Sequence, residues 1–137
     1  MYFFEVKVKY QRQTGEENPG NVTETYMVES INPGNAEARV IEEIKPMIFG
    51  EHEVPKIIKR KIYDLFPGTG DHWFKAAIEI IVINDSGIEF RAKQTIMVQG
   101  SDISDAIKRI KEQLPGIDFE IISIAKSPIL EVYRATK

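Results

Sequence analysis

The sequence predicts an α+β fold: an internally duplicated β-β-α-β unit that forms a largely antiparallel six-stranded sheet with two helices on one face. Each half of the chain carries two stretches of alternating apolar residues, then a helical apolar stripe, then a third alternating stretch. When the chain is aligned with itself at an offset of seventy residues, ten pairs are identical, against about four expected by chance. The identical pairs are Phe4/Phe74, Thr25/Thr95, Met27/Met97, Val28/Val98, Ala36/Ala106, Arg39/Arg109, Glu42/Glu112, Phe49/Phe119, Lys56/Lys126 and Tyr63/Tyr133.

The length of the chain, 137 residues, is typical of one domain with a shared core. We therefore interpret the chain as a single domain made of two repeats, at residues 1–67 and 71–137, joined by a linker at 67–70. The linker is a short Pro-Gly-Thr-Gly segment.

The first repeat opens with a half-buried strand at 4–10, where apolar and charged residues alternate. The stretch 11–21 is rich in Gly, Glu, Asn and Pro and predicts a long hairpin loop, followed by a returning strand at 22–29. The Asn-Pro pair at 32–33 is typical of a helix start. A strand at 54–66 completes the repeat.

The second repeat has a tighter hairpin, because its strands at 73–83 and 88–98 flank an Asn-Asp-Ser-Gly turn. Asp102 is expected to cap a helix that ends at the Pro-Gly pair 115–116. The last strand is predicted at 119–133. Here an offset of 67 matches the apolar residues better than 70, so the two helix-to-strand connections are expected to differ by three residues.

One predicted strand is apolar at nearly every position, from Ala77 to Ile83. Such a strand is expected to be central or covered on both faces. Because two helices on one face leave the other face open, the sequence favours a homodimer formed through the sheet or its edge.

The composition excludes several classes of function. The net charge is −3 with both signs spread evenly, which argues against a large nucleic-acid footprint. Cysteine is absent, which removes disulfides, thiolate nucleophiles and sulfur-ligated metals. We find neither a signal-peptide pattern nor an apolar stretch long enough for a membrane span. We therefore expect a cytoplasmic protein with no cofactor and no membrane partner.

The strongest local concentration of charge lies in the last strand of the first repeat. Lys56, Lys59, Arg60 and Lys61 are candidates for phosphate contacts, and Tyr63 offers a surface for base stacking. In an extended chain, however, neighbouring side chains alternate faces, so these cations do not all point the same way. The alternative interpretation is an edge strand whose lysines prevent unwanted strand pairing.

The two histidines each lie beside carboxylates, at residues 51–53 and 71–72. A histidine with a carboxylate can bind zinc or transfer protons, which gives a second alternative, a small metal-assisted hydrolase that uses His52 or His72. The chain has no His-x-x-x-His spacing and no Gly-x-Ser-x-Gly motif. We therefore assign no catalytic and no metal-binding residue.

Aromatic residues cluster at the starts of the two repeats. Tyr2, Phe3, His72 and Trp73 are candidates for the lining of a pocket, although core packing is the favoured interpretation. Because polar groups do not cluster as they do in active sites, the leading interpretation is a non-enzymatic binding or adaptor module. We expect it to act through protein–protein contacts or self-association.

Several segments together resemble a known family. They are the opening Phe-Glu-Val-Lys-Val-Lys-Tyr strand, Val22-Thr23-Glu24, the acidic helix at 36–43, Ile58-Lys59-Arg60, the Trp73-Phe74-Lys75-Ala76 strand start and the late Pro-Ile-Leu-Glu-Val at 128–132. The pattern resembles small proteins from gut anaerobic bacteria and their mobile elements, catalogued as a domain of unknown function. The resemblance covers almost the whole chain and implies a shared fold, but it implies no catalytic or ligand-binding residue. The chain differs from the family pattern in its longer loop before Val22.

Overall fold

The structure is a computed structural model and describes residues 1–12 and 20–135. It confirms the α+β class, with two helices and mostly strands. Residues 13–19 of the predicted hairpin loop lie outside the described residues. The elements are β1 (Tyr2–Arg12), β2 (Gly20–Ser30), α1 (Pro33–Ile44), the 3₁₀ helix η1 (Lys45–Met47), β3 (Ile48–Arg60), β4 (Asp64–Phe66), β5 (His72–Ile83), β6 (Glu89–Gly100), α2 (Ile103–Gln113), β7 (Phe119–Lys126) and β8 (Ile129–Tyr133).

The predicted single six-stranded sheet is wrong, because the strands form two four-stranded sheets. Their orders are β3-β1-β2-β8 and β4-β6-β5-β7. Both strands that were expected to close a repeat, at 54–66 and 119–133, are split in two. After the first break, the short strand β4 pairs in parallel with β6 and not with β3. After the second break, the short strand β8 pairs in parallel with β2 and not with β7.

The chain divides into two compact units that differ from simple halves. Unit 1 comprises Met1–Lys61 and the segment that begins at Pro128, whereas unit 2 comprises Ile62–Ser127. The chain therefore passes from one unit to the other twice. β4 follows α1 and β3 of unit 1 in the chain but completes the sheet of unit 2. β8 follows α2 and β7 of unit 2 but completes the sheet of unit 1. The predicted repeat boundaries stay a prediction.

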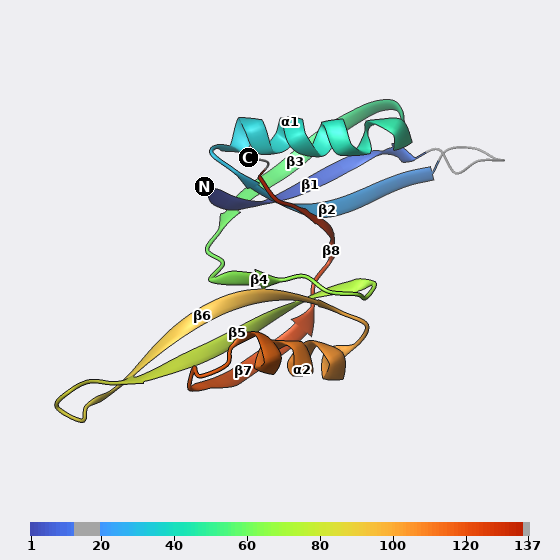
Figure 1. Ribbon diagram of the computed structural model, residues 1–137. Coiled ribbons are helices and arrows are strands. Elements are labelled where there is room, and N and C mark those ends of the chain that lie inside the picture. The colour runs from blue at the N-terminus through green and yellow to red at the C-terminus, as the bar shows by residue number, and fades with distance from the viewer. Residues whose placement is uncertain (13–19, 136–137) are drawn as a thin grey trace. The chain divides into compact units, whose positions relative to one another are not determined.

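In unit 1, β1 lies between β2 and β3 in an antiparallel arrangement, and α1 lies across one face of this sheet (Figure 1). Asn32 caps α1 as expected, because its Oδ1 accepts a hydrogen bond from the Asn35 backbone N at 2.7 Å. The alternation along β1 places every second residue under the helix. The core comprises Phe4, Val6, Val8, Tyr10, Tyr26, Val28, Ala36, Val40 and Ile44.

Unit 2 is built in the same order, with β5 between β6 and β7 and with α2 across one face (Figure 1). Asp102 caps α2, accepting a hydrogen bond from the Asp105 backbone N at 2.7 Å. The core comprises Phe66, Phe74, Ala76, Ile78, Ile96, Val98, Ala106, Ile110 and Leu114. No helix among the described residues has the length and apolar character that crossing a bilayer requires.

The two units hold their fourth strand with the same contacts. The Gly68 backbone N donates to Gln99 Oε1 at 3.1 Å in unit 2, and the Ala135 backbone N donates to Glu29 Oε1 at 3.0 Å in unit 1. Gln99 and Glu29 are seventy residues apart, whereas Ala135 and Gly68 are 67 apart. The strand registers correspond in the same way, as Leu65↔Met97 and Phe66↔Val98 match Val132↔Met27 and Tyr133↔Val28.

Candidate binding groove

A hollow in unit 1 lies between one side of α1 and the first half of β3. Its volume is about 720 Å³, within the range of small-ligand sites. The helical positions are spaced i, i+1, i+4, i+5 and i+8, which places them on one side of the helix, next to the buried stripe. We call this hollow the α1–β3 groove. It is lined by Glu37, Ala38, Ile41, Glu42, Lys45, Ile48, Gly50 and His52.

The groove has an apolar floor that the fold itself does not require. Ala38 is exposed, and Ile41 and Ile48 are only partly buried against the unit 1 core. Seventy residues further along the chain, α2 carries Lys108 and Lys111 where α1 carries Ala38 and Ile41. Since a helix of the same packing accepts lysine at these positions, the apolar residues in α1 point to a contact outside the core.

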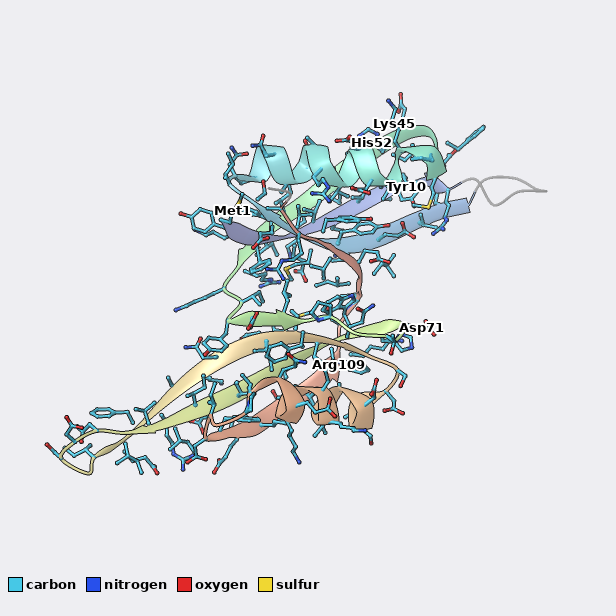
Figure 2. All side chains as sticks on the ribbon, in the orientation of Figure 1. Met1, Tyr10, Lys45, His52, Asp71 and Arg109 are labelled. Carbon is cyan, nitrogen blue, oxygen red and sulfur yellow. The ribbon has the colours of Figure 1, made fainter. Side chains whose placement is uncertain are left out.

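The rim of the groove is acidic. A smaller hollow of about 310 Å³ adjoins it and shares His52. Together the two hollows present four carboxylates against two lysines, and Figure 2 shows Lys45, His52 and Tyr10 at one end of unit 1. A positively charged ligand is therefore favoured. The carboxylates are Glu37, Glu42, Glu51 and Glu53, and the lysines are Lys9 and Lys45.

The groove runs beside the edge of a sheet, because β3 is an outer strand of its sheet. Among the described residues, β3 pairs only with β1. Its second half contains Pro55, Lys56 and Lys59, residues of the types that protect edges from unwanted pairing. Its first half has neither proline nor lysine, and Gly50 adopts a φ of 79° at an irregularity in the ladder. The part of the edge that lines the groove is thus the part without proline or lysine.

A buried carboxylate lies on the helix-covered face of the same unit. Glu24 is 9% exposed, and it accepts hydrogen bonds from the Tyr10 hydroxyl at 2.5 Å and the Tyr26 hydroxyl at 2.7 Å. Arg12 Nη1 donates to its other oxygen at 2.9 Å. Burial, followed by the hydrogen bond to Glu24, raises the pKa of Tyr10 to about 12 and raises the pKa of Tyr26 further.

Sequence reasoning missed this cluster. The available signal was Glu24 itself, a charged residue opposite Val8 at a position of β2 where the alternation of apolar residues predicts an inward-facing side chain. With both phenols and the guanidinium satisfying it, Glu24 stabilises unit 1 and is not presented to a ligand.

The basic strand is placed partly as expected. Arg60 is half-buried and pairs with Glu5, with Nη2 at 2.8 Å from the carboxylate, so its charge is compensated. Lys59 lies on the other face, with Nζ at 3.6 Å from the centre of the Tyr2 ring. The alternation of faces is therefore present, and two of the four cations already have partners.

The other candidates in this segment are exposed. Lys56 lies on β3 and Lys61 just beyond it. Tyr63 also exposes its side chain, and its backbone N donates to the Thr95 carbonyl in unit 2. A nucleic-acid role for these residues stays a prediction.

The four aromatic pocket candidates belong to different units. Tyr2 lines a hollow of about 370 Å³ at the start of α1, and Phe3 is partly buried with the Arg134 guanidinium over its ring. In unit 2, His72 makes an edge-to-face contact with Phe74. Trp73 is buried, as core packing predicts. The pocket proposed for all four stays a prediction.

The histidines do not assemble a metal centre in the part of the chain that the structure describes. There, no group of three or more His, Cys, Asp or Glu residues is arranged to hold a metal ion. His52 is exposed at the junction of the two hollows in unit 1, and His72 lies in unit 2.

Fold and groove together define an α+β protein with two sheet-and-helix units and a groove on the first. The model of the family described as Domain of unknown function (DUF4494) matches residues 2–135. The chain therefore belongs to this family, which confirms the resemblance to a domain of unknown function. A search of the curated proteins gives no match.

Proposed function

We propose that this protein is a binding module that holds an extended segment of a partner protein in the α1–β3 groove. The observation that carries the proposal is an apolar floor, the exposed Ala38 and the partly exposed Ile41 and Ile48, inside an acidic rim and beside an outer strand of the sheet. Extended peptides bind such edges through main-chain hydrogen bonds and gain specificity from side-chain pockets.

The chemistry of the groove defines the partner segment. An apolar side chain of the partner would lie over Ile41 and Ile48, and lysine or arginine residues beside it would face Glu37 and Glu42. Burial of one large apolar side chain contributes roughly 1.5–3 kcal/mol. The exposed charge pairs add less than about 1 kcal/mol each, but they select for basic partners.

We also infer that the two units arose by duplication and then diverged at this surface. The matching strand registers and the matching backbone contacts at Gly68 and Ala135 support a common origin. The divergence supports the binding role, because unit 2 has lysines in place of the apolar floor. The same comparison provides a matched control for every groove variant.

Selection from a library of random twelve-residue peptides tests the proposal. We expect enriched peptides to combine one large apolar residue with lysine or arginine. A fluorescein-labelled selected peptide should then bind with its affinity reduced about tenfold or more by Ile41→Glu. Glu42→Lys should weaken binding in the same way, whereas Glu112→Lys, at the equivalent position of α2, should not.

Two results would contradict the proposal. One is a peptide that binds equally well to wild type and Ile41→Glu. The other is an equal loss of affinity in Glu42→Lys and Glu112→Lys, because this would indicate non-specific attraction by an acidic protein. Circular dichroism of each variant establishes that the fold is retained.

The nucleic-acid alternative predicts a different result. Polarisation with short single-stranded and duplex DNA and RNA should show micromolar affinity that falls steeply with salt if Lys59, Arg60 and Lys61 contact phosphates. Because Arg60 is paired with Glu5 and Lys59 lies over Tyr2, we expect flat curves.

A further inference from the structure

The β5–β6 hairpin extends beyond the rest of unit 2. β7 pairs with β5 from Phe74 to Ile80, and the Ile81 backbone N donates to the Asp118 carbonyl at 2.8 Å, so in the described structure no third strand lies beside residues 82 and 83. Figure 1 shows the two strands continuing past both α2 and β7 as a narrow ribbon. We call residues 82–91 the ribbon end.

One face of the ribbon end is apolar. Val82 and Phe90 lie opposite each other in the antiparallel register, two residues beyond the pair Ile80↔Ala92. By alternation they lie on the face that α2 covers further along the sheet. Val82 is 54% exposed and Phe90 55% exposed, and Ile88 extends the apolar strip towards the turn. The other face carries Arg91 in ion pairs with Glu79, Glu89 and Glu120.

The corresponding part of unit 1 is built differently. There η1 and the start of β3 supply Met47 and Ile48, which pack on the core, and β3 continues the ladder as far as Arg12↔Ile48. Seventy residues before Val82 and Phe90 the chain has Arg12 and Gly20. The apolar strip of unit 2 is therefore uncovered, and the architecture of the unit does not require it.

We propose that the strip packs against the same strip of a second copy of this chain. A twofold contact places each apolar residue against apolar residues of the other copy, and it brings no charge into the contact, because the Arg91 ion pairs lie on the opposite face. This surface is independent of the α1–β3 groove.

The exposed area indicates a weak dimer. The large side chains of the strip expose on the order of 100 Å² each, so the contact buries roughly 600–800 Å² in total. Stable interfaces bury about 1,200–2,000 Å². We therefore expect a weak, transient dimer that forms only at high protein concentration.

Sedimentation velocity over a range from about 5 to 500 μM tests this proposal. The wild type should shift from monomer to dimer, and Val82→Glu or Phe90→Glu should keep it monomeric. Ile83→Glu is the matched control, because Ile83 is 64% exposed on the opposite face of the same ribbon. Ile41→Glu in the groove should leave the dimer unchanged, which separates this proposal from the proposed function.

The absence of cysteine permits a second measurement. Under oxidation Val82→Cys should form a disulfide-linked dimer faster than Ile83→Cys. The proposal is overturned by a wild type that stays monomeric at the highest concentration or by a dimer that Val82→Glu leaves intact. It is equally overturned if Ile83→Glu disrupts the dimer as strongly as Val82→Glu, since the contact would then involve the other face.

Discussion

Replacement of Glu24 by alanine should destabilise unit 1 strongly. The carboxylate is the shared acceptor of the Tyr10 and Tyr26 hydroxyls, and both tyrosines are 3% exposed. In Glu24→Ala both hydroxyls lose this acceptor where water has little access. The change therefore tests whether the cluster is a structural unit.

The expected cost follows from the burial of each donor. An unsatisfied buried polar group costs about 1–3 kcal/mol, so two phenols give about 2–6 kcal/mol. Arg12 adds little, because its side chain is 41% exposed and water can replace the carboxylate. Glu24→Gln keeps one acceptor oxygen and should cost about 1–2 kcal/mol.

Urea denaturation followed by circular dichroism measures these differences. The control is the triple variant Tyr10→Phe, Glu24→Leu and Tyr26→Phe, which removes donors and acceptor together and should lie within about 1 kcal/mol of the wild type. Unit 2 supports this expectation, since it carries Ile80 and Ile96 at the tyrosine positions. A loss below about 0.5 kcal/mol in Glu24→Ala, or a triple variant as unstable as the single one, would refute the reasoning.

Three further predictions concern pH and packing. The pKa of Tyr10 is raised to about 12 by burial and by Glu24. The neutral hydroxyl therefore contributes its full stabilisation below the ordinary pKa near 10, and this contribution should be lost between a pH of about 10 and 12. Titration of tyrosinate absorbance, followed together with circular dichroism, measures this loss. Gly70→Ala should lower the free energy of unfolding by about 2 kcal/mol or more in chemical denaturation, because a Cβ at this position would lie 2.3 Å from the backbone of Gly100, the last residue of β6. Gly34→Ala is the control and should be neutral or stabilising, because the atom nearest to a Cβ there lies 3.5 Å away. Ala36→Leu and Ala106→Leu both overpack fully buried sites and should each cost about 1–3 kcal/mol; similar falls in melting temperature would support the equivalence of the two helices, and an unaffected variant would break it.

Local signals predicted most of the elements. The caps at Asn32 and Asp102 determine where both helices begin, and the alternation from Phe4 to Tyr10 identifies β1 and its buried face. These signals act within a few residues, so they can be read from the sequence alone.

The candidate site was only partly predictable. The sequence drew attention to His52 beside its two glutamates, and the structure places it where the two hollows of unit 1 meet. The apolar floor was hidden, because Ile41 continues the helical pattern of the buried stripe and reads as core, and Ala38 gives no signal of its own. Only the position of β3 shows that these side chains border an open groove.

The sequence by itself determined the α+β class, both helices with their caps, and the approximate positions of the six longer strands. The tertiary structure alone decided that β4 and β8 leave the strands before them and complete two separate sheets. The physical reason is that alternation records which face of a strand is buried, not which strand lies beside it. Main-chain hydrogen bonds are the same for every partner, so the pairing of β4 with β6 and of β8 with β2 depends on contacts between residues far apart in the chain.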